Sequence, residues 1–439
     1  MKFILKTIKR ILLSLVLLLT IGLAVMFITD PVLTFRILTL NLGPEEQVAG
    51  GQTIDLTTAA KKARSISAAA LTAAIAFGEQ NKSHALIVYH NDAIQLEHYY
   101  SGHDADSFSS TQSMHKSVLA MLVGIAIEQG YIVSADEPAS TYLTEWADDE
   151  RAKITIKHML NQESGIDFPT VGINPLGGFF RLIFGPNIGP EALHQLLEAT
   201  PGSRFDYNSI NPQNLGLIIE RATGKRYSEY LSEALWQRIG VPDAAVVLDS
   251  NEHRTARMFC CLNATARSWL HLGLLHLSEG RIADQQVVPV DWMRHIVIPG
   301  ANNPNYGYLT WLGNKYEEYR YYNRKTAVRV FQSEPFAVPD VIYFDGFGGQ
   351  RVYIVPSHGL IIVRIGALTP DMDEAFLPNV IIRGILSGSK QQNQQSSQDF
   401  TSRRNSLRVS IWERKCPSMQ DVVITEFCFS TPRIIMHMC

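Results

Sequence analysis

The sequence predicts an α+β fold: one antiparallel sheet is built from both ends of a domain, a helical region is inserted between them, and one transmembrane helix precedes the domain. Strand-like runs occur at residues 85–97 and again between 306 and 365, whereas residues 151–280 are mostly helical in pattern. Strands at both ends with helices between them favour α+β over the alternation that a parallel sheet requires. The third observation is an uncharged, apolar run at residues 11–29.

The amino-terminal residues predict export and a membrane anchor. Residues 1–10 are a basic, cytoplasmic segment, and the run 11–29 is just long enough to cross a bilayer as a helix. A cleaved signal peptide, with a small-x-small site at Gly22-Leu23-Ala24, is the alternative. Hydrophobicity continues to Ile28, which favours the uncleaved anchor. We expect a single-pass protein of the inner (cytoplasmic) membrane, with the rest of the chain on the exported (periplasmic or extracellular) side.

Composition excludes several classes of protein. The 439 residues contain 39 basic and 42 acidic side chains, a net charge of −3, which argues against nucleic acid as a partner. With 18% charged residues the chain is not of a disordered or collagen-like type. Cys260 and Cys261 are adjacent, and no cysteine has zinc-site spacing, so we expect small buried side chains, no disulfide framework, no metal and no cofactor. The oligomeric state stays open.

The domain elements follow a connector at residues 30–69. A short alanine-rich helix at 67–76 comes first, then two strands, 85–89 and 93–97, around a turn at Asn91-Asp92. The next helix, 113–129, is apolar almost all round, which places it inside the domain, and Gly130 ends it.

Later elements are indicated by caps and alternation. Asn211-Pro212 is expected to cap and start a helix that ends at Gly224, and further helices begin near Ser228 and Thr265. Strands are expected at 306–312, 341–344, 351–355 and 360–365. The folded domain would thus span 70–388. Residues 389–439 begin with a glutamine-rich stretch and are expected to form a low-complexity linker and tail.

The motif Ser113-Met114-His115-Lys116 opens the apolar helix. Three residues are nearly one helical turn, so Ser113 and Lys116 face the same way. A lysine enclosed by apolar side chains loses its proton more easily and can act as a base. An ordinary helix cap followed by a surface lysine is the alternative, but the apolar helix leaves little solvent for Lys116. A second copy, Ser387 to Lys390, has no such helix behind it and is interpreted as chance.

Two further segments carry candidate groups. Tyr207-Asn208-Ser209 lies on a loop before a helix and offers a proton carrier and a hydrogen-bonding amide, although a turn with an aromatic anchor would look the same. Gly346-Phe347-Gly348-Gly349-Gln350 opens a strand, where a free amide could serve an oxyanion hole or the glycines could form a bulge. His115 is expected to lie at the surface or to pack in the core. Tyr306 and Tyr308 are expected to be strand aromatics in the core, with the lining of a pocket as the alternative.

In this order and spacing, the three segments resemble the serine β-lactamase and penicillin-binding-protein superfamily. The chain is most similar to class C β-lactamase-related hydrolases, in particular the 6-aminohexanoate-dimer (nylon oligomer) hydrolase branch, over residues 70–388. The supporting stretches are Ser113 to Ser117 with Val123 to Ala126, Ile154 to Leu160 with Ser164-Gly165, Pro201 to Ser209 with Leu215-Gly216, and Ala264 to Arg267. The resemblance implies a β-lactamase-like fold.

The resemblance also implies roles. Ser113 would be the acylated nucleophile, Lys116 its base, and Tyr207 the proton shuttle. The backbone amides of Ser113 and of a residue near Phe347 would form the oxyanion hole. The substrate-binding or oxyanion positions would be Asn208, Ser209, Gly346 and Phe347.

The chain departs from the family pattern at two places. The third motif, Lys-Thr-Gly or often His-x-Gly in relatives, falls at Phe344-Asp345-Gly346 and has no cation. That absence lowers the expectation of β-lactam or peptide-carboxylate recognition. Ser209 stands where β-lactamases carry asparagine after Tyr-x, so Asn208 is the candidate replacement.

These observations predict an exported, membrane-anchored serine hydrolase that cleaves a small-molecule ester or amide, small oligomeric amides included, through an acyl-enzyme. The alternative is a penicillin-binding or cell-wall sensor module, or a catalytically silent homologue, that binds without turnover. The sequence does not distinguish β-lactamase, esterase and amidase activities, and it does not specify the natural substrate.

Overall fold

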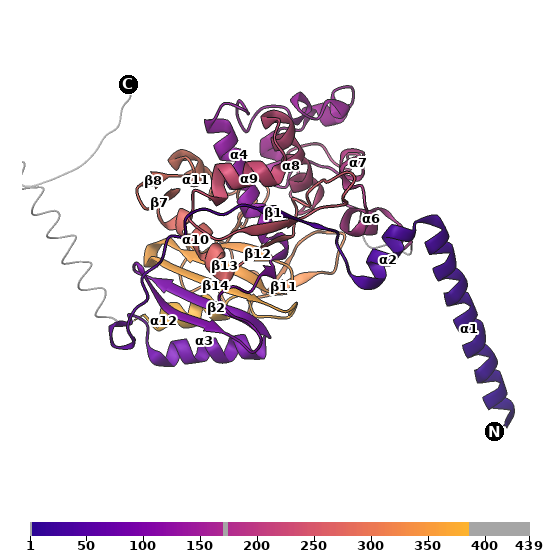
Figure 1. Cartoon of the computed structure of the whole chain (residues 1–439), viewed down its shortest axis with the longest axis horizontal. Helices are drawn as coiled ribbons and strands as arrows, with labels where there is room; N and C mark the ends of the chain where they lie inside the picture. Colours follow the sequence, from indigo (N-terminus) through magenta and orange to yellow (C-terminus); the bar gives the residue numbers. More distant parts are fainter. Residues whose placement is uncertain (1, 170–173, 386–439) are drawn as a thin grey trace, which may run out of the picture. The chain divides into compact units, whose positions relative to one another are not determined.

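The centre of the fold is a six-stranded antiparallel sheet, seen in a computed structural model that describes residues 2–169 and 174–385 (Figure 1). Its strand order is β3-β2-β14-β13-β12-β9. The bounds are β2 Ser83–His90, β3 Ala93–Tyr99, β9 Trp311–Leu312, β12 Ile342–Gly346, β13 Gln350–Val355 and β14 Leu360–Gly366. Because β2 pairs with β14, the prediction that both ends of the domain build one antiparallel sheet is confirmed.

Helices cover both faces of this sheet, which explains why its central strands are apolar on both sides. Helices α3 (Ala68–Gln80) and α12 (Phe376–Arg383) pack together on one face, and α10 (Ala266–Leu277) lies on the other (Figure 1). Every residue of β14 is buried. Ser67 and Thr265 accept hydrogen bonds from the first turns of α3 and α10, so short polar side chains define where these helices begin.

Helix α4 (His115–Glu128) runs through the largest hydrophobic core and follows a single 3₁₀ turn, η2 (Gln112–Met114). All residues from His115 to Ala126 are buried, as the sequence predicts for a helix that is apolar on every face. The inserted region consists of short helices: α5 Ile156–Leu160, α6 Gly178–Phe184, α7 Ile188–Leu193, α8 Ile210–Thr223, α9 Tyr227–Leu231 with the π turn η6 Ser232–Trp236, and α11 Val290–Ile296.

Several strands differ from the prediction. The strand expected at 306–312 is reduced to β9, because Leu309 takes a left-handed conformation (φ 47°) and Tyr308 donates to Ile296 of α11 instead of a neighbouring strand. Strands too short to show alternation were not predicted. They form a second sheet, β1 Glu45–Val48, β5 Ala244–Val247, β6 Leu262–Ala264 and β4 Ser109–Ser110, and two hairpins, β7 Arg281–Ile282 with β8 Gln285–Gln286 and β10 Tyr319–Tyr321 with β11 Arg329–Phe331.

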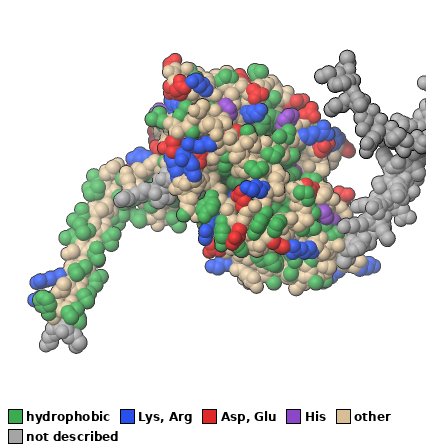
Figure 2. Space-filling view, turned by 180° about the vertical axis from the view of Figure 1, so that it is seen from behind, with side chains coloured by type: hydrophobic (Ala, Val, Ile, Leu, Met, Phe, Trp, Pro, Cys, Tyr) green, Lys and Arg blue, Asp and Glu red, His purple; other side chains and the backbone are tan. Residues whose placement is uncertain are grey.

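The amino-terminal segment contains helix α1 (Lys2–Thr29). Residues 3–29 form a helix long and apolar enough to cross a membrane, with a mean hydropathy of 3.0 and none of it buried. Apolar side chains accordingly cover this helix in Figure 2. Residues 30–69 are more than a connector, because they supply helix α2 (Pro31–Thr39) and strand β1, both packed on the body. The expected tail, 389–439, and the second Ser-x-x-Lys copy lie outside the described residues.

The adjacent residues Cys260 and Cys261 are buried, as predicted, and form a disulfide with each other. The bond links neighbours and therefore does not connect distant parts of the chain. It lies just before β6, in the segment whose carbonyl groups contact the start of α4.

Candidate active site

Ser113 lies in η2, at the point where the chain turns into α4. Gln112, directly before it, has a positive φ of 52°, a conformation that costs a non-glycine residue about 1 kcal/mol. The turn is closed by Met114, whose amide donates to the Thr111 carbonyl over 3.2 Å. This strained turn presents the Ser113 hydroxyl at the amino-terminal end of a buried helix, where developing negative charge is favoured.

Lys116 is the buried partner of Ser113. Its Nζ lies 2.7 Å from Ser113 Oγ and 2.7 Å from the carbonyl oxygen of Phe259. Only 1% of Lys116 is exposed, and this burial lowers the pKa of its amine to about 7, although the charge of Asp345 partly opposes the shift. A neutral amine in this position can donate to Phe259 and accept the proton of Ser113.

Tyr207 completes the group that the sequence predicts. Its ring lies 5.0 Å from Lys116 Nζ, and its hydroxyl interacts with Ser113. Burial raises the pKa of Tyr207 well above its ordinary value, so the phenol is neutral near pH 7 and can pass a proton in either direction. The rings of Tyr306, Trp311 and Tyr322 surround it at centroid distances of 6.0, 5.6 and 5.3 Å.

Asn208 and Ser209 follow Tyr207, and both make contacts that support the start of helix α8. Asn208 is buried, and its Oδ1 accepts from the backbone amide of Asn211 over 3.0 Å, so Asn208 provides the capping side chain that we expected from Asn211. The backbone amide of Asn208 donates to Gln162 Oε1 over 3.1 Å. Ser209 is half-buried at the start of α8, where its carbonyl accepts from Gln213.

Gly346 and Phe347 bring the end of β12 to the turn that carries Ser113. A Cβ atom on Gly346 would lie 2.2 Å from the Thr111 carbonyl oxygen, closer than any side chain tolerates. Gly348 and Gly349 both have positive φ, 75° and 88°, and turn the chain into β13. Phe347, between them and Gly346, is 39% exposed. The strand end therefore approaches η2 closely because residue 346 has no side chain.

Asp345 occupies the third-motif position and is buried in a four-membered charge cluster. It pairs with Arg320 at 2.6 Å and with Arg351 at 2.5 Å, and Glu374 pairs with the same two arginines at 2.7 and 3.0 Å. Burial opposes ionisation of Asp345, but Arg351 and Arg320 outweigh it and hold the pKa of the carboxyl below its ordinary value. The cluster is charge-balanced and lies close enough to affect Lys116.

Two supporting elements were not found from sequence. The β10–β11 hairpin carries Arg320, and its connecting loop carries Tyr322 and Asn323; Tyr322 donates to Asp345 over 2.9 Å and Asn323 to the Tyr207 carbonyl over 3.1 Å. Gln162, in a loop after α5, supports the segment that carries Tyr207. The only sequence signal for these elements is the aromatic-rich run Tyr319 to Tyr322, which surrounds Arg320.

His115 behaves as predicted for a packing residue. It is fully buried, with Nδ1 2.6 Å from the Cys260 carbonyl and Nε2 2.7 Å from the Tyr227 hydroxyl. Burial lowers the pKa of His115 to about 4, which keeps the ring neutral near pH 7. Both ring nitrogens are occupied, so His115 has no free nitrogen for proton transfer to Ser113.

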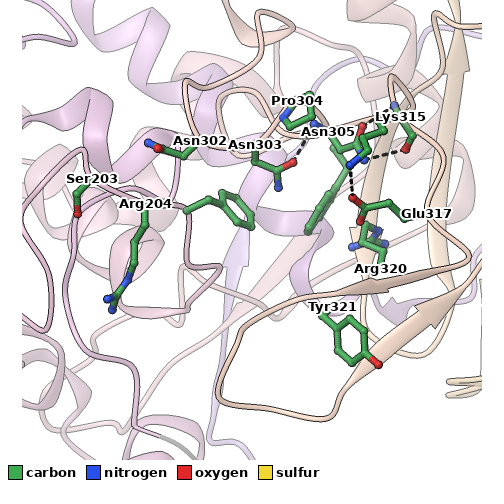
Figure 3. Close-up of a pocket in the computed structure, with 12 residues that line it drawn as sticks. Ser203, Arg204, Asn302, Asn303, Pro304, Asn305, Lys315, Glu317, Arg320 and Tyr321 are labelled. Atoms are coloured by element: carbon green, nitrogen blue, oxygen red, sulfur yellow. Dashed lines mark hydrogen bonds and ion pairs between the residues drawn. The ribbon is translucent and has the colours of Figure 1, made fainter.

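A polar cavity of about 470 Å³ adjoins the aromatic group around Tyr207 (Figure 3). Phe205 and Trp311 line it, and Trp311 is also a neighbour of Tyr207. Figure 3 shows Ser203 and Arg204 on one side and Lys315 and Arg320 on the other. The volume is sufficient for a small organic group.

Comparison with known proteins identifies the family. The Beta-lactamase family profile matches residues 69–382. The 6-aminohexanoate-dimer hydrolase of Paenarthrobacter ureafaciens is 26% identical over 234 residues, an alignment that covers 51% of this chain and 59% of that relative.

Solved structures show the same fold. A Bacillus anthracis protein described as a 6-aminohexanoate-dimer hydrolase superposes with a TM-score of 0.63 at 20% identity, covering 81% of this chain and 94% of that one. A family VIII carboxylesterase gives a TM-score of 0.53 at 13% identity, covering 72% and 98%. The fold is therefore the β-lactamase-like α+β fold, as predicted, and the chain belongs to the beta-lactamase family of serine hydrolases.

Proposed function

We propose that this protein is a membrane-anchored, exported serine hydrolase that cleaves a small ester or amide through an acyl-enzyme on Ser113. The observation that carries the proposal is the 2.7 Å contact between Ser113 Oγ and the buried amine of Lys116, whose pKa of about 7 leaves much of it neutral at physiological pH. The curated relative, a 6-aminohexanoate-dimer hydrolase, supports an amide as one substrate class.

Acylation begins with proton transfer from Ser113 Oγ to Lys116 Nζ. The Oγ atom then bonds to the carbonyl carbon of the substrate, and the electron pair of the C=O bond moves to its oxygen. Collapse of this intermediate breaks the bond to the leaving group, which takes a proton through the Tyr207 hydroxyl as Lys116 gives its proton back. The product is an ester on Ser113 and a free amine or alcohol.

Deacylation uses the same groups in the reverse sense. A water molecule loses a proton to the Lys116–Tyr207 pair, attacks the ester carbon and releases the acid, and Ser113 recovers its proton. The backbone amides of Ser113 and Phe347 are the proposed oxyanion donors, supported by the close approach of Gly346 to the Thr111 carbonyl. Asn208 is occupied by Asn211, so we assign no substrate contact to its side-chain oxygen, and Ser209 stays a candidate.

The third-motif position bears on substrate choice. Asp345 provides no cation of its own, and the cations that surround it are already paired with two carboxylates. A substrate carboxylate at this position would add a third negative charge to a balanced, buried cluster, which is costly. We therefore propose neutral esters and unstrained amides as substrates in preference to β-lactams that carry a carboxylate.

Location and domain limits complete the proposal. We propose that residues 11–29 anchor the chain in the cytoplasmic membrane and that the domain 70–388 acts on the exported side. The apolar, exposed helix α1 supports an anchor, and the four basic residues at its amino-terminal end support a cytoplasmic amino terminus.

Burst kinetics on the detergent-solubilised full chain test the proposal. A p-nitrophenyl ester should give a rapid, stoichiometric release of nitrophenol followed by steady turnover, and mass spectrometry should locate the acyl group on Ser113. Ser117→Ala is a matched control, because Ser117 is buried one turn further along α4 and donates to the Leu309 carbonyl.

The outcomes separate the alternatives. A burst without turnover would favour a sensor module that acylates once. Activity that survives Ser113→Ala would contradict the assignment of the nucleophile. Neither burst nor labelling with esters and amides of several acyl lengths would indicate a catalytically silent homologue.

A further inference from the structure

Helix α2 is attached to the body through one face. Leu33 and Thr34 are fully buried on this face, and the Arg36 guanidinium donates to the carbonyl oxygen of Asp249 over 2.5 Å. The same guanidinium reaches the carbonyls of Phe184 and Gly185 at the end of α6, over 3.2 and 3.3 Å. A buried cation held by three carbonyls fixes α2 against the body, so α2 is part of the folded domain and not a flexible tether.

The opposite face of α2 is apolar and exposed. Val32, Phe35 and Leu38 are 45%, 55% and 56% exposed, and Leu40, just beyond the helix, is 75% exposed. Residues three apart lie on one side of a helix, so these side chains form a single stripe on the side opposite Leu33. One exposed apolar residue is ordinary, but a contiguous stripe marks an interaction surface.

The stripe borders an apolar groove of about 480 Å³. It is lined by residues of α2 and of the segment that follows it: Pro31, Val32, Phe35, Arg36, Asn41, Gly43 and Pro44. The groove extends the apolar surface beyond the helix itself. The Asp30 carboxylate, just before α2, accepts from the Leu33 amide over 3.0 Å and so caps the helix.

The occupant follows from the position of α2 in the chain. Helix α1 ends at Thr29 and α2 begins at Pro31, so only Asp30 separates them. One residue spans at most about 3.6 Å. If α1 crosses the bilayer, α2 must therefore begin at the bilayer surface, where a short helix with an apolar stripe lies along the boundary between headgroups and acyl chains.

We propose that the stripe of Val32, Phe35 and Leu38 rests in the surface of the membrane that α1 spans, and that Arg36 transmits this contact to the body. The partner is the lipid bilayer. The catalytic domain is then held against the membrane in a defined orientation, since α2 is bound to lipid on one face and to the protein on the other. This inference rests on the proposed anchor.

Photo-crosslinking of the full chain in vesicles of phosphatidylcholine and phosphatidylglycerol tests it. p-Benzoylphenylalanine replaces Phe35 in one variant, Phe27 of α1 in a second and Phe108 in a third. Phe108 is a matched control, because it is 48% exposed and lies on the body close to β4. Peptide mass spectrometry then measures the lipid adduct at each position. We expect adducts at positions 27 and 35, with at least about a tenfold lower yield at 108.

Each of the other possible results would contradict the proposal. Adducts at position 27 but not at 35 would overturn the surface contact while leaving the anchor intact. No adduct at 27 would show that the anchor itself is wrong, and this inference would fall with it. Equal yields at 35 and 108 would show that the body meets lipid without a preferred face, which contradicts a defined orientation.

Discussion

Arg320 donates to Asp345 across 2.6 Å, and this ion pair joins the β10–β11 hairpin to strand β12, whose end approaches the turn that carries Ser113. Related enzymes often place a cation on the strand at this point. Here the strand carries the carboxylate and the hairpin carries the cation. The pair affects Lys116 through Asp345. The negative charge of Asp345 raises the pKa of Lys116, whereas burial lowers that pKa by a larger amount.

Removing the nucleophile, the base or the proton carrier should abolish turnover while the fold stays intact. We expect Ser113→Ala to lower kcat/KM by at least about 10³-fold, and Lys116→Ala or Tyr207→Phe by about 10²–10⁴-fold. Steady-state kinetics with circular dichroism would check this. Tyr230→Phe is the control for the tyrosine, because Tyr230 is buried but donates to Gln129 far from Ser113. Rates near wild type in all three variants would refute the mechanism.

The rate should fall in acid with a midpoint near the pKa of Lys116. Burial lowers that pKa to about 7, so below pH 7 the amine gains a proton and no longer accepts one from Ser113. A profile of kcat/KM from pH 5 to 9 should therefore rise with pH and level off above about 7.5. A profile that is level down to pH 5 would contradict a neutral Lys116 as the base.

Asp345→Asn should move this acid limb. The negative charge of Asp345 raises the pKa of Lys116, so its removal should shift the limb to lower pH by about one unit. It should also lower the free energy of unfolding by about 3–5 kcal/mol, because Arg320 and Arg351 lose a buried partner.

Glu374→Gln provides the comparison. It disrupts the same arginines, but Glu374 does not contribute to the shift at Lys116. The expected result is a similar loss of stability with the acid limb in place. If both variants move the limb equally, the coupling would be structural in origin and not a direct effect of the Asp345 charge.

Gly346→Ala should impair catalysis through packing. The new Cβ would lie 2.2 Å from the Thr111 carbonyl oxygen, so either β12 or the Ser113 turn must move. A shift of this kind can cost about 10²-fold in kcat. Gly189→Ala is the control, because the nearest atom to its Cβ, Thr255 Oγ1, is 3.9 Å away. Equal kcat values in the two variants would argue against a tight contact between β12 and the turn.

Lys116→Met should stabilise the inactive protein. The unfolded amine has a pKa of 10.5 and the folded one about 7, so between these values folding must release a proton. Lys116 therefore costs stability below pH 10.5, and the full cost is present near pH 7. We expect the variant to gain about 1–2 kcal/mol in unfolding free energy at pH 7 and less at pH 10.

Denaturant titrations at the two pH values would measure this difference. Lys157→Met is the control, because the Lys157 side chain is 48% exposed. A gain that does not shrink as pH rises would show that improved packing, and not removal of a buried amine, stabilises the variant.

Parts of the fold that depend on local residue pattern were predicted from the amino-acid sequence. The all-round apolar helix predicted that residues 115–126 are buried, and that burial in turn predicted an enclosed Lys116 one turn from Ser113. Paired apolar runs at both ends of the domain predicted the sheet. These features were readable because helix and strand periodicity depend on residues that are neighbours in the chain.

The groups that support the site come together only through contacts between residues far apart in the chain. The carbonyl of Phe259 that holds Lys116 is 143 residues away, and Arg320, Tyr322 and Asn323 come from a hairpin with strands of three residues. The oxygen of Asn208, a candidate for substrate binding, accepts a hydrogen bond from the amide of Asn211 in α8, a contact that the sequence did not predict. Helix and strand periodicity cannot predict such contacts, because they depend on how distant loops pack together. The local sequence does not show which distant backbone group a side chain will contact.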